Sequence, residues 1–289
     1  MQDSIITEWT DENAGVVYRV SEKLEDFPTD VHHVEVYDTP AFGRVLRVNG
    51  HILTAENDEW IYHENLVHPA ALSHPEPKRA LVLGGGTGGS ARQLLKYDSI
   101  ERVLIGELDG FLVDTVRQHF EKIHQGAFDD ARLEIKLGDA NEWINNIEEQ
   151  FDLIVLDLVG YAEKAEGFYS RAFFERCRAL LTDNGVLALS LGSPQRHSGA
   201  FVDRHTALQE VFTTVVPYLV PLSLHGGLWG MAIARRNDAS GNLTADEVDS
   251  RLRSRAVGQL EYYNGAVHAG QQALPNFVAA LLAPPTRSR

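Results

Sequence analysis

A glycine-rich loop, GGGTGG at positions 84–89, is the first segment of this sequence that is suited to chemistry. The loop follows the short apolar run LVL and precedes a pattern typical of a helix. Glycine lets a ligand approach the backbone closely, and the start of a helix offers free N–H groups. Such a corner therefore binds anions and nucleotides. The loop alone is weak evidence, because tight packing also requires glycine.

Two acidic residues stand at the ends of the next two predicted strands. Glu107 closes LIGE about twenty residues beyond the loop, where a carboxylate can bind both hydroxyls of a ribose. Asp139 follows IKLG and is placed to reach an adenine amino group. A nicotinamide cofactor would also satisfy the loop and Glu107. The sequence has one nucleotide-binding half with a glycine loop, and this together with Asp139 favours an S-adenosyl donor over a dinucleotide. Both acids could instead be helix N-caps or loop anchors.

A third acid, Asp157, ends the apolar run FDLIVLD. A carboxylate at the end of such a run is costly unless something uses it. The carboxyl edge of a parallel sheet is where ligands of doubly wound folds bind. We therefore predict a chemical role for Asp157, with anchoring of a loop as the alternative.

The elements that must position these residues fall into two parts. Residues 1–60 are predicted to form a small antiparallel β domain, with a hairpin turn at VNGH. A helix follows in DEWIYHENLVHPAAL. Beyond residue 79, short apolar runs alternate with helical patterns, which predicts a mostly parallel sheet. Residues 61–289 are therefore assigned to one catalytic domain.

Composition narrows the class of protein. The chain has 289 residues and a formal net charge of −15, which disfavours nucleic acid as a partner and suits a cationic substrate. No apolar run is long enough to span a membrane. The N-terminus lacks the pattern of a signal peptide, so we expect a cytoplasmic protein. One cysteine and unfavourably spaced histidines predict no metal site.

The motifs together resemble those of the polyamine aminopropyltransferases, the spermidine synthase family, along nearly the whole chain. Near the N-terminus, AFGRVLRVNGHILTAENDEWIYHE resembles the family pattern FGRVLxLDGxxQTTExDEFxYHE. The loop ALVLGGGTGG resembles VLxIGGGDGG. Further on, FDLIVLDLVGYAEKAEGFYSRAFF resembles FDVIxxDxxDPxGPxExLFxxxFY, and EYYNGAVHAGQQALPNFV resembles the closing YYNxxxHxAxFxLPxxx.

This resemblance implies a class I S-adenosylmethionine-transferase Rossmann-like fold, a doubly wound sheet preceded by the small β domain. It implies transfer of an aminopropyl group from decarboxylated S-adenosylmethionine to an amine, with no permanently bound cofactor. It also implies a homodimer or homotetramer. In this reading Asp157 is the general base and Tyr62 assists it. The residues expected to bind the donor are Gly84, Gly85, Gly86, Thr87, Gly88, Glu107, Asp139, Ala140 and His32, and those expected to bind the acceptor are His63, Glu64, Glu166 and Trp229.

The sequence also departs from the family pattern at positions that matter. Thr87 stands where the family loop carries an acid that faces the propylamine end of the donor, and Gly160 replaces a second acid. An aminopropyltransferase with compensating acids remains the first interpretation. A relative that uses intact S-adenosylmethionine for amine methylation, aminocarboxypropyl transfer or donor cyclisation is the second. A non-catalytic nucleoside-binding partner protein is the third.

Overall fold

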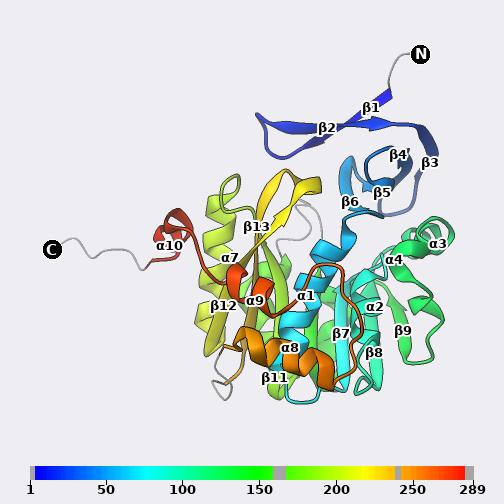
Figure 1. Cartoon of the computed structure of the whole chain (residues 1–289). Coiled ribbons are helices and arrows are strands. Elements are labelled where there is room, and N and C mark those ends of the chain that lie inside the picture. Colours follow the sequence, from blue (N-terminus) through cyan, green and yellow to red (C-terminus); the bar gives the residue numbers. More distant parts are fainter. Residues whose placement is uncertain (1–3, 159–166, 238–241, 284–289) are drawn as a thin grey trace.

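The computed structural model describes residues 4–158, 167–237 and 242–283, and its N-terminal part contains two antiparallel sheets (Figure 1). A two-stranded hairpin comes first, and a four-stranded sheet in chain order follows. Their strands are β1 (Ser4–Trp9), β2 (Gly15–Val20), β3 (Glu22–Pro28), β4 (His33–Thr39), β5 (Gly43–Val48) and β6 (His51–Ala55). Asn49 and Gly50 have φ of 53° and 83°, which confirms the predicted tight turn.

Helix α1 (Glu59–Ser73) joins the N-terminal sheets to the rest of the chain. It is buried along almost its whole length, because one side packs on the central sheet and α2 and α8 pack against it. The helix contains Pro69, which the sequence pattern did not single out. Tyr62, His63 and Glu64 all lie in its first two turns, so α1 fixes the position of three predicted site residues.

A seven-stranded sheet forms the centre of the protein, in the order β12-β13-β11-β10-β7-β8-β9. The five strands from β11 to β9 pair in parallel, and β13 and β12 add an antiparallel edge. This arrangement confirms the predicted mostly parallel sheet. The strands are β7 (Arg79–Gly84), β8 (Arg102–Glu107), β9 (Leu133–Leu137), β10 (Phe151–Asp157), β11 (Leu181–Gly192), β12 (Thr214–Leu222) and β13 (Gly227–Arg235).

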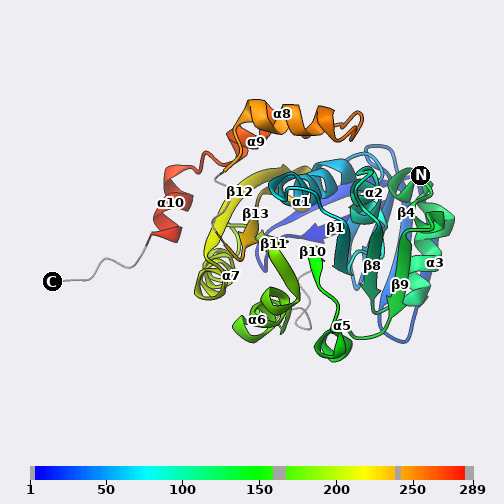
Figure 2. The same ribbon diagram turned by 90° about the horizontal axis from the view of Figure 1, so that it is seen from below.

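Helices cover both faces of this sheet (Figure 2). Helices α1 and α2 lie on one face with α8 and α9 outside them, and α5, α6 and α7 lie on the other. The helices after α1 are α2 (Gly89–Leu95), α3 (Gly110–His119), α4 (Glu121–His124), α5 (Ala140–Trp143), α6 (Arg171–Leu180), α7 (Ser198–Val211), α8 (Ala245–Ser254), α9 (Gly265–Gln271) and α10 (Asn276–Leu282). Among the described residues, no helix has the length and apolar character needed to cross a bilayer.

Two helices are shorter than their sequence patterns predicted. The run FLVDTVRQHFEKI at residues 111–123 has the pattern of one helix, but the structure divides it at Phe120, whose φ of −124° is not helical. The helix expected over residues 140–147 is reduced to α5 and the 3₁₀ turn Ile144–Asn146. Phe120 is fully buried, and it stands both at the end of α3 and directly before α4.

The order of strands creates a crevice at one place along the carboxyl edge of the sheet. After β7 the chain continues to β8 on one side, whereas β10 pairs on the other side of β7. The connections that leave β7 and β10 therefore diverge, and ligands of open α/β sheets bind at such a divergence. The glycine loop leaves β7, and Asp157 ends β10, so the fold brings both to this crevice.

Candidate active site

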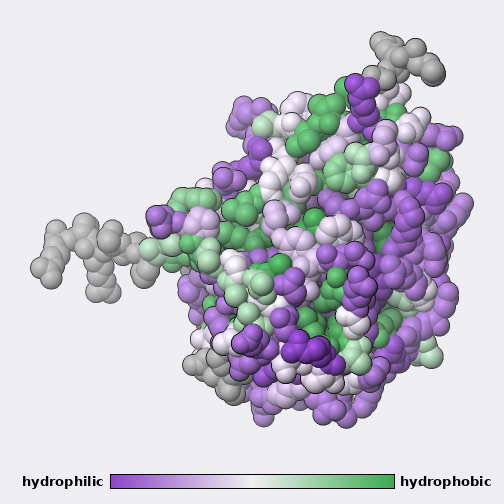
Figure 3. Space-filling view, in the orientation of Figure 1, coloured by the Kyte–Doolittle hydropathy of each residue, from purple (hydrophilic) through white to green (hydrophobic). Residues whose placement is uncertain are grey.

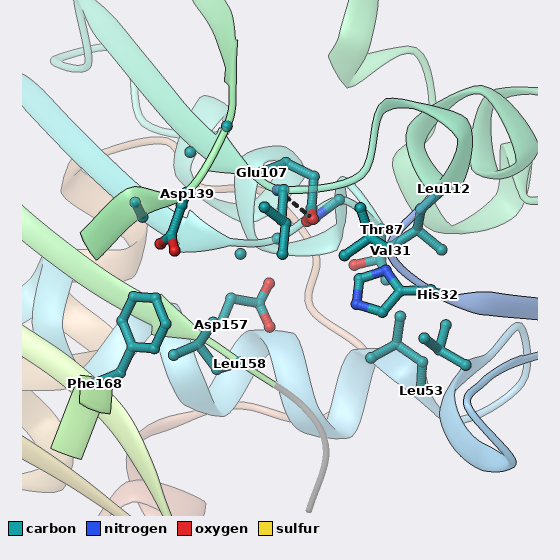
Figure 4. A pocket seen from close by; sticks show the side chains of 18 of the residues that line it. Val31, His32, Leu53, Thr87, Glu107, Leu112, Asp139, Asp157, Leu158 and Phe168 are labelled. Carbon is teal, nitrogen blue, oxygen red and sulfur yellow. Dashed lines mark hydrogen bonds between the residues drawn. The ribbon is translucent and has the colours of Figure 1, made fainter. Parts of the chain in front are cut away.

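A cavity of about 550 Å³ lies at this crevice. One wall consists of the ends of β7, β8 and β10 and the loop after β9. The other consists of residues from β5, β6 and the loops beside them, and His63 of α1 also lines the cavity. Figure 4 shows Glu107, Asp139 and Asp157 arranged around one space, with His32, Thr87 and Leu53 towards one end. Phe168 and Asp139 lie towards the opposite end. The cavity therefore has two distinct ends joined at Glu107.

The glycine loop packs tightly between two of the acids. Gly84 and Gly85 have positive φ, at 77° and 79°. A Cβ on Gly84 would lie 2.4 Å from the carbonyl oxygen of Asp157, and a Cβ on Gly86 would lie 2.6 Å from Oε2 of Glu107. Any side chain at these positions would displace the loop. Gly88 does not line the cavity, and it serves the turn into α2, where a Cβ would meet Phe128 and His124.

Glu107 is held rigidly at the end of β8. Its Oε2 accepts a hydrogen bond from the N–H of Gly86 at 3.0 Å, and its Oε1 accepts from Leu108 and Asp109 at 2.7 and 3.2 Å. Burial raises the pKa of Glu107, and these backbone donors and the nearby charge of His32 oppose the rise. The carboxylate thus anchors the loop and also lines the cavity, and its contact with a ribose stays a prediction.

Asp139 and its neighbours form the opposite end of the cavity. Asp139 is the N-cap of α5, where one carboxylate oxygen accepts a hydrogen bond from the N–H of Asn141 at 2.8 Å. Its side chain still lines the cavity, as do Ala140 and Asn141. Phe168 supplies an aromatic ring on the same side. An acid beside an aromatic ring can receive a planar base that carries an amino group.

Asp157 and Tyr62 each present a buried polar atom without a hydrogen bond to the residues that the structure describes. Oδ2 of Asp157 and the hydroxyl of Tyr62 are buried, and neither makes a hydrogen bond within the described part of the chain. Burial raises the pKa of Tyr62 well above its usual value, and the nearby negative charge of Asp157 adds to the rise. Buried polar atoms normally find partners. These two therefore mark a place where a ligand supplies the missing hydrogen bonds.

His63 lies between these atoms and the glycine loop. Its Nδ1 is 2.6 Å from Oε2 of Glu59, and Glu59 also pairs with Arg92 at 2.8 Å. Its Nε2 lies 3.3 Å from the hydroxyl of Thr87. Burial alone lowers the pKa of His63, but the hydrogen bond to Glu59 and the charges of Glu59 and Asp157 outweigh it and raise the pKa. The imidazole is fixed from behind by a buried ion pair.

His32 repeats this arrangement on the opposite wall. Its Nδ1 is 3.0 Å from Oδ2 of Asp109, and the same oxygen accepts a hydrogen bond from the hydroxyl of Thr29 at 2.6 Å. Asp109 is buried and caps α3 with its other oxygen. The loop before β4 is thereby tied to the loop after β8. These contacts hold the N-terminal four-stranded sheet beside the cavity.

Other residues predicted to bind the substrate have different positions. Glu64 does not line the cavity, and its carboxylate accepts hydrogen bonds from the N–H groups of Glu261, Tyr262 and Tyr263 at 2.8–2.9 Å. The prediction for Glu64 is therefore wrong. Trp229 also lies outside the cavity lining, and its indole N–H donates to Ser190. Glu166 lies outside the described residues.

Sequence reasoning missed several members of the site. Glu59, Arg92 and Asp109 hold the two histidines, and Asn141 and Phe168 line the cavity. The four-residue spacing of Glu59 and His63 on a predicted helix was a usable signal for the first pair. Asp109 stands directly before a helical pattern, as an N-cap does. No local pattern indicated Phe168.

Two family models match the sequence in succession. The spermidine synthase tetramerisation domain matches residues 5–56, and the spermine/spermidine synthase domain matches residues 59–244. A polyamine aminopropyltransferase from Nitrosomonas europaea is 41% identical over 94% of this chain and 83% of its own length. Polyamine aminopropyltransferase 1 from Pseudomonas aeruginosa is 31% identical over 91% of this chain and 92% of its own.

A solved structure agrees with these relatives. A spermidine synthase in complex with the transition-state analogue AdoDATO superposes with a TM-score of 0.91. The two chains are 29% identical, and the match covers 98% of this chain and 96% of the other. Likeness at this level extends across the N-terminal sheets and the central sheet alike.

Proposed function

The chain belongs to the spermine/spermidine synthase family, and from this premise we propose that its cavity joins decarboxylated S-adenosylmethionine to an amine of the polyamine class. The observation that carries the proposal is the pair of buried, unpartnered atoms, Oδ2 of Asp157 and the hydroxyl of Tyr62, at the switch point of the sheet. An ammonium or amine is the ligand that both atoms can bind. The amine would lose its proton there.

The nucleoside of the donor would occupy the part of the cavity between Glu107 and Asp139. The carboxylate of Glu107 would accept hydrogen bonds from the ribose hydroxyls, and Asp139 would accept from the adenine amino group. Phe168 offers a ring on which the base can pack. The glycine backbone from Gly84 to Gly86 lets the ligand lie flat against the loop.

The reaction requires the attacking amine to be deprotonated. A sulfonium is already a good leaving group, but an alkyl amine with a pKa near 10.4 is neutral in only about one molecule in two thousand at pH 7. That deficit costs about 4–5 kcal/mol. A carboxylate in hydrogen-bond reach of the amine offsets this cost by receiving the proton as attack proceeds.

Asp157 is the residue we assign to this role. The amine nitrogen forms a bond to the propyl carbon that is attached to sulfur, and the bond from that carbon to sulfur breaks. Its electron pair stays on sulfur and gives methylthioadenosine. The proton of the amine passes to Asp157, and Tyr62 orients the nucleophile from the same side. His63 is a positioning residue, because it borders Asp157 without a hydrogen bond to it.

The experiment that tests this function is a direct assay. The purified chain is incubated with decarboxylated S-adenosylmethionine and a panel of diamines, and the products are read by mass spectrometry. We expect methylthioadenosine and an aminopropylated amine in equal amounts. Absence of turnover with every diamine, in a protein that binds methylthioadenosine, would contradict aminopropyl transfer to this class of acceptor.

We further propose that the protein assembles as a homodimer or homotetramer through the hairpin β1–β2. One face of this hairpin exposes Ile5, Trp9 and Val17, each between 56% and 57% accessible. Figure 3 shows hydrophobic side chains on this end of the molecule. Three large apolar side chains on one exposed hairpin face suit contact with another subunit. The match of residues 5–56 to a tetramerisation domain supports this assignment.

A further inference from the structure

One end of the cavity presents imidazole and hydroxyl groups where a cationic ligand would be expected to meet carboxylates. His63 and His32 each line the cavity, and each has a buried carboxylate behind it, Glu59 and Asp109. The hydroxyl of Thr87 lies 3.3 Å from Nε2 of His63. A carboxylate that accepts from one ring nitrogen leaves the other nitrogen directed away from it.

The alkyl tail of the donor extends into this end, an assignment that rests on the proposed function. With the ribose on Glu107 and the base beside Asp139, the sulfonium and its chain must lie on the opposite side of Glu107. Figure 4 shows Thr87, His32 and Leu53 on that side. Asp157 lies where the two parts meet, and it is the residue assigned to the attacking amine.

The two carboxylates behind the histidines are already engaged by other protein groups. Among the described residues, Glu107, Asp139 and Asp157 are the acids that line the cavity. Glu59 is bound by His63 and Arg92, and Asp109 is bound by His32 and by Thr29. The donor tail therefore meets the hydroxyl of Thr87 and Nε2 of His63, which can donate hydrogen bonds to a carboxylate. Oδ2 of Asp157 lies 3.9 Å from the same nitrogen, and His32 also borders this end of the cavity.

We propose that this end of the cavity admits the α-carboxylate of intact S-adenosylmethionine, so that the protein binds the carboxylated donor as well as the decarboxylated one. The hydroxyl of Thr87 and Nε2 of His63 are the groups placed to hold that carboxylate. An acid at position 87 would instead place two negative charges within about 4 Å of each other, which lowers affinity by about a thousandfold at an effective dielectric of 20. Threonine removes that penalty. Intact S-adenosylmethionine then competes with the decarboxylated donor for the same site.

The test compares three ligands by isothermal titration calorimetry on the full chain: methylthioadenosine, decarboxylated S-adenosylmethionine and intact S-adenosylmethionine. The variants are Thr87→Asp and, as a neutral control of similar size, Thr87→Asn. The readout is the ratio of the dissociation constants for the two donors, because a general effect of a substitution on the site cancels in that ratio. We expect the wild-type protein and Thr87→Asn to bind the two donors within about tenfold of each other. Thr87→Asp is expected to shift the ratio by at least about a hundredfold against intact S-adenosylmethionine.

The outcomes separate this inference from the proposed function. Binding of methylthioadenosine and of the decarboxylated donor, with intact S-adenosylmethionine rejected by more than about a hundredfold in the wild-type protein, overturns the inference alone. Failure of all three ligands to bind overturns the proposed function and the inference together. The wild-type comparison is sufficient even where a variant does not fold.

Discussion

Nε2 of His63 lies 3.9 Å from Oδ2 of Asp157, although α1 and β10 are far apart in the sequence. This distance is too long for a hydrogen bond. Both atoms are buried, and that oxygen of Asp157 has no other partner in the described structure. A nitrogen atom of a bound amine can therefore reach Asp157 without displacing a protein group.

Asp157→Asn removes the proton acceptor and keeps the shape of the side chain. We expect turnover to fall by at least about a hundredfold while methylthioadenosine still binds, because loss of a general base slows chemistry more than donor binding. Rates and calorimetric affinities are measured side by side. Asp183→Asn is the matched control, since that side chain is 92% exposed near the start of β11, at the end of the strand away from the cavity. A variant that keeps its turnover would exclude Asp157 as the base.

Glu107→Gln tests the ribose contact. The amide has one acceptor oxygen in place of two, so it cannot serve both the loop N–H groups and the ribose hydroxyls. We expect the affinity for methylthioadenosine to fall at least about tenfold, the effect of one lost hydrogen bond to a charged group. Glu142→Gln is the control, because Glu142 is an exposed acid in α5. Equal affinity in both variants would contradict the contact.

Glu59→Gln tests the control of His63 by the ion pair behind it. Burial lowers the pKa of His63, and Glu59 is the main group that opposes this effect. Without the charge of Glu59 we expect the pKa of His63 to fall. Titration of the imidazole by NMR in both proteins measures the change. An unchanged or higher pKa in the variant would show that Glu59 does not set the protonation of this ring.

Asp58→Asn gives a pH-dependent prediction for stability. Burial raises the pKa of Asp58 from 3.8 to about 6, so the folded state binds a proton that the unfolded state releases in this interval. The wild-type protein thus loses stability as the pH rises through this window, and the variant does not. We expect the stability of Asp58→Asn relative to wild type to rise by about 2 kcal/mol between about pH 4 and pH 7. Urea unfolding at both pH values measures it, and a constant difference would contradict the shift.

Val17→Lys tests assembly through the hairpin. The substitution places a charge on the exposed apolar face that we assign to a subunit contact. We expect sedimentation velocity to show smaller species than the wild-type protein shows at the same concentration. Phe277→Ser on α10, where the side chain is 41% exposed, is the control for loss of an exposed hydrophobic group. An unchanged sedimentation profile for Val17→Lys would place the subunit contact elsewhere.

The sequence was most informative where a residue type is required by its own backbone or strand. Gly84 and Gly85 need positive φ, and Glu107 and Asp157 end apolar strands, so local rules were enough to find them. The parallel sheet followed from the same alternation of strands and helices. These four residues come together because of the order of the strands in the sheet. The family resemblance predicted that order, whereas the periodicity of the sequence did not.

Residues that act through other side chains were harder to find. Arg92 and Asp109 matter because of what they contact across the fold, and no short-range pattern contains that information. Glu64 was misassigned for the opposite reason. It lies next to His63 in the sequence, but neighbours on a helix point in different directions, and Glu64 faces the C-terminal segment.

The contact of Glu64 with residues 261–263 has a consequence for folding. Its carboxylate is 2% exposed, and three backbone N–H groups from near the end of the chain satisfy it. Until residues 261–263 are in place, α1 lacks the three donors that satisfy this carboxylate, and burial of Glu64 without them would be costly. The final packing of α1, and with it the placement of Tyr62 and His63, therefore depends on a segment 197–199 residues further along the chain.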